Sequence, residues 1–429
     1  MKKALALLLA AVLVFALCAT ACADGSEKIK LVGMCWGSTA QYEQQSADVL
    51  AANPDLAEKY EISWVLGGEG DGECAEKIRL ALSAGENLCD FCVLNYTQVP
   101  EFAREEVLMD ISDAVAPYED TMTASGKNLS QYEGKTIAVP FEVKTKVWFY
   151  RSDIFEECGV NVEDIKNVDD FIAAGKKIQE TYPNSYMWNF GAQPAAYQYY
   201  LTLSGNGASF FDEDGEYNIA SDAGVRAMLE DYKKMYDAGI IADISDWTPD
   251  WESALADGTI LTQPCAGWLG QDIFLPTYSG EGNEWKVTTW PVIGGTDAGS
   301  DAGGSVYAVP AFSAHPEEAA EFIAATCLGE EGSKVVFHMT GSLPQNTNAL
   351  NDESLFADQA EGYFGDTFVN AQIAALDKFG TFNYSPNASS EQTIVVEYFR
   401  KAVCGELTID EALEAAQEDL QTVIGNAFD

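Results

Sequence analysis

The first half of the chain alternates between short apolar segments and amphipathic segments, and this alternation constrains the fold more than any other feature. Residues 29–34 and 61–66 have the composition of strands, and residues 39–53 between them have the apolar spacing of a helix. Further segments of both kinds follow: a helix over 74–84, a strand over 90–94 and a strand over 136–139. Because helical crossovers join parallel strands, we predict an α/β fold with a mainly parallel sheet in this half.

Two later helices have clear start signals. Asn167 can cap a helix that has Asp170 at its third position, and Thr408 with Glu411 forms a capping box ahead of an apolar stripe. Such stripes are typical of helices that pack on a core. We therefore expect the α/β pattern to continue to the end of the chain.

The amino terminus has the layout of a secretory signal peptide. Lys2 and Lys3 precede an apolar run over residues 4–17, and the run ends in Ala19-Thr-Ala-Cys22. This ending resembles the bacterial lipobox, in which the cysteine sulfur receives a diacylglyceryl group. The resemblance implies that residues 1–21 are a lipoprotein signal peptide, that Cys22 carries the lipid anchor and that residues 22–28 are a short tether.

An ordinary signal-peptidase cut is the alternative, because the lipobox prefers an aliphatic residue where this chain has Ala19. Either cleavage exports the chain. With lipid on Cys22, we expect the protein on the extracellular face of the cell membrane.

The strong acidity excludes several classes of partner. The chain has 68 Asp plus Glu against 24 Lys plus Arg, a formal net charge of -44. Such a charge repels nucleic acid and anionic lipid surfaces. We therefore predict no nucleic-acid partner.

The cysteines predict neither a disulfide framework nor a metal site. Outside the leader segment only Cys89 and Cys92 lie close together, and they fall on a predicted strand, where residues three apart point to opposite faces about 10 Å apart. A zinc site would need more histidine than His315 and His338 provide. We predict buried free thiols, no metal and no cofactor.

Four regions of the sequence resemble the extracellular solute-binding proteins of ABC importers, in particular the group (family 1) that includes maltodextrin-binding and other oligosaccharide-binding proteins. The matching segments are GKTIAVPFE at 134–142 with VWFYRSDIF at 147–155, GGSVYAVP at 303–310 with PEEAAEFI at 316–323, TGSLP at 340–344, and the closing helix at 405–424. Their order and spacing match that family over nearly all of the exported chain.

The resemblance implies a two-lobed, periplasmic-binding-protein-like fold of type II, with two Rossmann-like lobes and a ligand cleft between them. It implies a first lobe of residues 29–141 plus 303–345 and a second lobe of residues 146–298 plus 349–429. It also implies a carbohydrate ligand and an ABC permease as partner, and we expect a monomer.

Candidate ligand-binding residues follow from position and chemistry. A sugar site needs aromatic rings for stacking on C–H faces and carboxylate or amide groups that bond to hydroxyls. The candidates near strand ends, crossovers and aromatic-rich segments are Trp36, Tyr96, Glu142, Trp188, Gln193, Tyr197, Trp268 and Tyr384. Trp247 and Trp251 form a weaker aromatic group.

Three other functions remain open at this stage. A secreted glycoside hydrolase needs only a carboxylate pair, although no nucleophile elbow or His-based triad is present. A glycan receptor without transport would share all of these features. Within transport, a polyamine or a glycerophosphodiester is the alternative cargo. We predict a binding protein rather than an enzyme.

Overall fold

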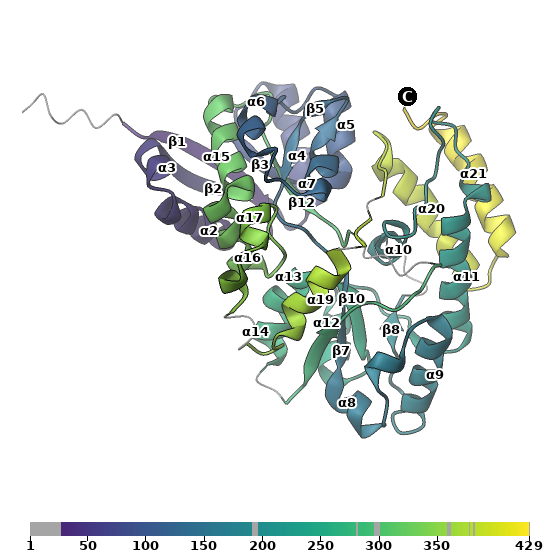
Figure 1. The fold of residues 1–429 in the computed structure, drawn as a ribbon. Helices are drawn as coiled ribbons and strands as arrows, with labels where there is room; N and C mark the ends of the chain where they lie inside the picture. The colour runs from purple at the N-terminus through teal and green to yellow at the C-terminus, as the bar shows by residue number, and fades with distance from the viewer. Residues whose placement is uncertain are drawn as a thin grey trace, which may run out of the picture.

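The computed structural model describes residues 27–190, 196–279, 282–295, 301–357, 362–376, 378–380 and 382–428. The described chain forms two lobes, each built on its own β-sheet (Figure 1). The first sheet has five strands in the order β2-β1-β3-β12-β6, and the second has three in the order β10-β7-β11.

The first sheet is mainly parallel, as the sequence predicts. Its strands are β1 (Ile29–Trp36), β2 (Tyr60–Gly68), β3 (Phe91–Asn95), β6 (Ala138–Pro140) and β12 (Ser305–Ala308). β1 pairs in parallel with β2 and β3, whereas β12 lies antiparallel between β3 and β6. The strand predicted over 136–139 is divided between β6 and the hairpin strand β5 (Lys135–Thr136), which pairs with β4 (Gln131–Tyr132).

Alternating side chains give this sheet a helical layer on each face. Phe91 and Val93 of β3 pack in one core cluster, and Cys92 and Leu94 pack in the other. The surrounding helices are α2 (Thr39–Ala52), α3 (Pro54–Lys59), α4 (Asp71–Ala84), α5 (Val99–Arg104), α6 (Ser112–Val115), α7 (Ala124–Ser130), α15 (Pro316–Leu328) and α16 (Glu330–Thr340). The predicted helices over 39–53 and 74–84 are confirmed, and α4 begins three residues earlier.

Free thiols are confirmed for the described residues, and most of them are buried. All eight described cysteines are free; six, including Cys89 and Cys92, are buried, whereas Cys158 and Cys404 are only partly buried. The described part of the chain contains no group of three or more His, Cys, Asp or Glu that could hold a metal ion. None of its helices has the length and apolarity needed to cross a membrane.

The second lobe has both antiparallel and parallel pairings, like the first: its three-stranded sheet is antiparallel, and a parallel bridge between Tyr186 and Ile260 joins it to the parallel pair β8 (Trp188–Asn189) and β9 (Ile241–Ala242). The three-stranded sheet consists of β7 (Val147–Arg151) flanked by β10 (Thr262–Cys265) and β11 (Trp285–Thr288). β7 runs away from the first lobe, and the two flanking strands run back towards it. Val147 and Phe149 face one core cluster and Trp148 the other.

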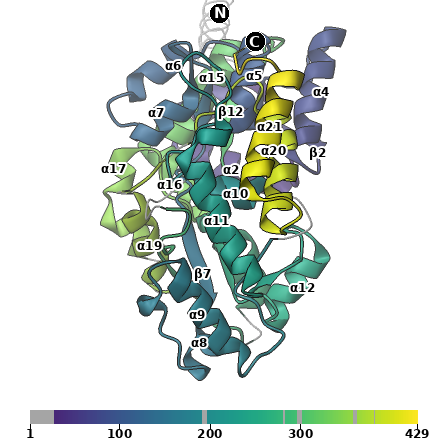
Figure 2. The same ribbon diagram turned by 90° about the vertical axis from the view of Figure 1, so that its right-hand side faces the viewer.

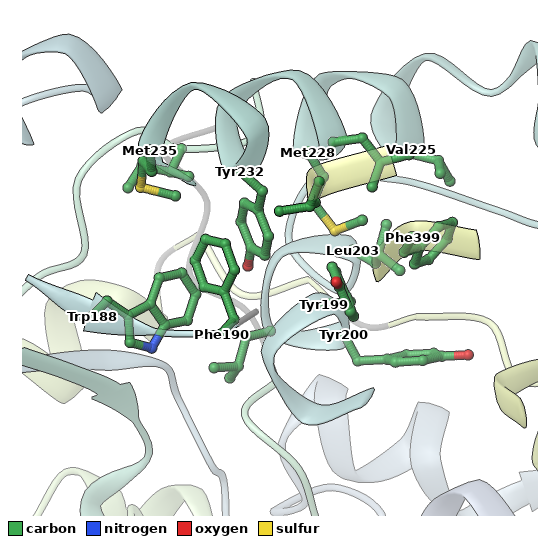
Figure 3. Packing of buried hydrophobic residues seen from close by; sticks show 14 of the residues in the cluster. Trp188, Phe190, Tyr199, Tyr200, Leu203, Val225, Met228, Tyr232, Met235 and Phe399 are labelled. Atoms are coloured by element: carbon green, nitrogen blue, oxygen red, sulfur yellow. The ribbon is translucent and has the colours of Figure 1, made fainter. Parts of the chain in front are cut away.

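Aromatic side chains fill the larger core of the second lobe (Figure 3). Trp188 packs edge-on against Phe190 and Tyr232, with ring centroids 5.0 and 5.4 Å apart, and Tyr199 packs against Phe399. The helices and short strands around this lobe are α8 (Ser152–Glu157), α9 (Val168–Gln179), β8 (Trp188–Asn189), α10 (Ala196–Leu203), α11 (Ala223–Asp237), β9 (Ile241–Ala242), α12 (Pro249–Asp257), α13 (Gly267–Leu269), α14 (Leu275–Tyr278), α17 (Thr347–Leu350), α19 (Thr367–Leu376), α20 (Ala388–Val403) and α21 (Ile409–Val423). Figure 2 shows α20 and α21 side by side along α11.

Three crossover segments join the lobes and are hydrogen-bonded to one another. Residues 141–146 pair with residues 301–305 through Ala302 N–H to Lys144 O (2.7 Å) and Phe141 N–H to Ser305 O (3.1 Å). They pair with residues 341–346 through Val143 N–H to Leu343 O (2.7 Å). The crossovers therefore join the lobes through one three-stranded connection, and side-chain contacts such as Arg104 to Asn387 (3.3 Å) also link the lobes.

Replacing Asn167 by Ala should destabilise the second lobe. The Asn167 carboxamide accepts hydrogen bonds from the N–H groups of Asp169 (2.9 Å) and Asp170 (3.1 Å), which confirms the predicted helix cap. Losing it should lower the free energy of unfolding by about 1 kcal/mol in urea titrations. Asn167→Asp keeps an equivalent acceptor and is the matched control; equal losses in both variants would contradict the capping role.

Candidate functional site

A cavity of about 650 Å³ lies between the lobes against the crossover segments. Its wall combines the carboxyl ends of first-lobe strands, the crossovers and aromatic residues of the second lobe. A second cavity of about 320 Å³ shares Asp71, Asn95, Tyr197, Trp247 and Gly303 with it. Because these residues line both spaces, we treat the two as one cleft.

Strand ends of the first lobe supply one wall of the cleft. Trp36 ends β1, Glu69 follows β2, and Asn95 ends β3. The carboxyl ends of these parallel strands meet at the same edge of the sheet, where open α/β sheets bind ligands. Tyr96 follows in a short 3-10 helix that Asn95 and Gln98 cap reciprocally.

Three aromatic rings of the second lobe form the opposite wall. Trp247 lies 5.4 Å from Trp268 and 5.8 Å from Tyr197 between ring centroids. The Tyr197 hydroxyl donates to Ala302 O on a crossover (3.1 Å), which fixes this ring relative to the cleft floor. Together the rings provide apolar surface of the kind that stacks on C–H groups.

Trp247 has a conformation that favours a functional role. It is 46% exposed and has φ = 62°, in the left-handed region that bulky side chains seldom adopt. The preceding residue, Asp246, is buried and accepts hydrogen bonds from the buried side chains of Asn189 (2.6 Å) and Gln198. These bonds anchor the loop to the second lobe. Burial raises the pKa of Asp246 to about 6. The fold thus holds a strained, exposed indole at the cleft surface.

Glu142 and Lys144 place an ion pair on the crossover. The Lys144 ammonium lies 3.0 Å from Glu142 Oε1, while Glu142 Oε2 is buried and has no hydrogen-bond partner in the described part of the chain. Burial raises the pKa of Glu142 despite the nearby lysine. A buried carboxylate oxygen without a donor gains stability from any ligand that supplies one.

Asp301 provides a second carboxylate with a spare acceptor. It is 3% exposed and lies on another crossover within hydrogen-bonding reach of the Tyr96 hydroxyl, and its Oδ2 has no hydrogen-bond partner among the described residues. Burial raises the pKa of Asp301 to about 7. Tyr96 also lies within reach of Tyr384, so it connects the first lobe to a crossover and to the second lobe.

Most of the residues selected from the sequence lie in this cleft. Those that line it are Trp36, Tyr96, Glu142, Tyr197, Trp268 and Tyr384. Their contact with a ligand stays a prediction. Gln193 and Cys22 lie outside the described residues.

Trp188 requires a correction. Its side chain is fully buried among Phe190, Tyr232 and Trp290 in the second-lobe core and does not line the cleft (Figure 3). The aromatic density around it serves packing.

Sequence reasoning placed Trp247 only in a weaker aromatic group and did not select Lys144 or Asp301 as site residues. The Asp-Trp-Thr-Pro turn that precedes α12 is a signal that could have ranked Trp247 higher, whereas Asp301 had no distinguishing signal among so many acids.

Comparisons with known proteins point to one family and one fold. A family model described as bacterial extracellular solute-binding protein matches residues 50–361. An arabinooligosaccharide-binding protein of Halalkalibacterium halodurans is 23% identical, and the match covers 80% of this chain and 78% of that protein. A lactose-binding protein of Rhizobium radiobacter is 25% identical, and the match covers 58% of this chain and 59% of that protein. A transporter-associated binding protein from B. animalis subsp. lactis, solved with β-1,6-galactobiose, has a TM-score of 0.78 at 22% identity and covers 94% of this chain and 100% of that one. The two-lobed fold is therefore shown.

Replacing Asp301 by Asn should flatten the pH dependence of stability. Between about pH 4 and pH 7 the unfolded chain has lost the Asp301 proton while the folded protein retains it, so this group lowers the free energy of unfolding as pH rises through that window. Urea titrations from pH 4.5 to 8 should show a shallower decline in the variant. The control variant Asp164→Asn changes an exposed acid and should keep the wild-type dependence of unfolding free energy on pH. If wild type and Asp301→Asn showed the same dependence on pH, the raised pKa of Asp301 would be contradicted.

Proposed function

The chain belongs to the bacterial extracellular solute-binding protein family, and we propose that it captures a carbohydrate, a sugar or short oligosaccharide, in the cleft between its lobes and delivers it to the membrane permease of an ABC importer. The cleft binds and releases this cargo without chemical turnover. The lobes comprise residues 29–141 plus 303–345 and residues 146–298 plus 349–429.

The observation that carries the proposal is the pairing of exposed rings with unpartnered carboxylate oxygens. Trp247 and Trp268 offer flat apolar surface, and Glu142 and Asp301 each have one oxygen without a donor. A sugar ring offers the complement, because its C–H faces stack on indoles and its hydroxyls donate to carboxylates. The volume of the cleft accommodates more than one ring.

The printed descriptions of the relatives support the same class of cargo. One relative binds arabinooligosaccharides, another lactose, and a structural neighbour contains β-1,6-galactobiose. At these identities we carry over the class of ligand and leave the particular sugar to experiment.

Replacing Trp268 or Trp247 by Ala should weaken sugar binding. Loss of either ring removes stacking surface, and we expect the Kd of the best ligand in a panel of mono- and oligosaccharides to rise about tenfold, corresponding to about 1.4 kcal/mol. Calorimetric titration measures the Kd, and chromatography of the same samples measures turnover.

Tyr182→Ala is the control, because this second-lobe tyrosine bonds to Glu157 away from the cleft. No binding across the panel would overturn the carbohydrate proposal and direct the search to polyamines. Appearance of product would overturn the claim that the cleft lacks activity.

We further propose that Cys22 carries the lipid anchor that keeps the protein at the outer face of the membrane. Cys22→Ser should abolish incorporation of labelled fatty acid and move the exported protein from the detergent phase to the aqueous phase in a Triton X-114 partition. Cys404→Ser is the matched control and should behave as wild type. Unchanged partition of the Cys22→Ser protein would contradict the anchor.

A further inference from the structure

A third cavity, of about 420 Å³, lies in the second lobe and shares none of its lining residues with the cleft. It is bounded by the segment before β7, the short 3-10 helix η3 (Val162–Asp164), the segment after β11 and the region around the end of α19. Its described lining includes Lys146, Lys166 and Lys378 but a single acid, Glu163. We call this space the lysine pocket.

The charge of the lysine pocket reverses that of the chain. The whole protein has 24 basic residues against 68 acids, and the main interlobe cavity is lined by Glu69, Asp71 and Glu142 with only one lysine. The described lining of the lysine pocket therefore has more basic than acidic side chains on a strongly negative molecule. Such a site attracts small anions that the rest of the surface repels.

Lys146 is the most informative residue of the pocket. It is 3% exposed, and among the described residues its ammonium makes one hydrogen bond, to Leu201 O on α10 (3.0 Å). Burial alone lowers its pKa to about 7, with no carboxylate contributing. A buried ammonium without an anionic partner is costly, and an anion would supply both charge and hydrogen-bond acceptors.

Two further groups in the pocket have weak or no polar partners among the described residues. Trp290 Nε1 is buried and has no hydrogen-bond partner among them, and the Trp290 ring lies 6.0 Å from the Lys146 ammonium. Lys166 approaches Glu163 only at 3.8 Å, and both side chains are about 70% exposed, so water screens this pair. The lining thus combines lysine side chains with the Trp290 ring and the side chains of Thr288 and Thr289.

We propose that the lysine pocket binds a small oxyanion, a phosphate or carboxylate group on a free ion or small molecule, independently of the cleft. Lys146 and Trp290 form the buried end of the site, and Lys166 and Lys378 form its outer end. Because Lys146 directly follows Thr145, which pairs with Asp301 between two crossovers, the bound anion contacts the segment that joins the lobes.

The test is calorimetric titration of the purified protein with inorganic phosphate and, separately, with citrate, each against sodium chloride at matched ionic strength. We expect one site for at least one oxyanion and none for chloride. Lys166→Gln should weaken that binding about tenfold through loss of a charge-assisted hydrogen bond, while sugar affinity in the cleft stays unchanged. Comparing the phosphate and citrate arms identifies the preferred head group.

Lys286→Gln is the matched control, because this exposed lysine of β11 pairs with Glu156 outside the pocket and its loss changes the net charge equally. Trp290→Phe tests the buried end and should remove the change in tryptophan fluorescence that accompanies anion binding. Two outcomes would overturn the proposal: neither oxyanion binds better than chloride, or Lys286→Gln weakens binding as much as Lys166→Gln. Neither outcome bears on sugar capture.

Discussion

Backbone hydrogen bonds between the three crossover segments hold the two lobes together, and the cleft depends on them. Residues 141–146 occupy the middle position and bond to residues 301–305 on one side and to residues 341–346 on the other. Gln345 adds a side-chain bond to Glu142 O (3.0 Å). Small changes of backbone torsion in these few residues change the angle between the lobes while each sheet stays intact, as in hinge motions of other two-domain proteins.

The same segments carry the charged groups of the site. Glu142, Lys144 and Asp301 lie on the crossovers rather than on either lobe, so they form a common floor of the cleft. Among the described residues, one oxygen of each buried carboxylate has no donor. Under the proposed function, ligand hydroxyls would supply these donors and relieve the cost of the unsatisfied acceptors.

Local signals in the sequence were sufficient for four of the helices, those over 39–53 and 74–84 and those that begin after Asn167 and Thr408, and for most of the first sheet. The caps at Asn167 and Thr408 act within one helical turn, so their prediction needed no tertiary information. Trp36 and Tyr96 could be placed in the cleft because they follow strands, whose carboxyl ends share an edge. The antiparallel second sheet was not predicted, because its pairing joins β7 to strands more than 100 residues later.

Site residues that depend on long-range burial could not be separated from core residues. Trp188 and Trp268 both lie in aromatic-rich surroundings, yet one is fully buried and the other faces the cleft. Asp301 differs from other acids only because β12 returns to the first lobe beside residues 141–146. The buried thiols have a consequence for reactivity. Burial raises the pKa of Cys35 to about 11 and the pKa values of Cys74 and Cys265 to about 12, so in the folded protein these three thiols stay protonated at neutral pH and are poor nucleophiles towards oxidants and disulfides.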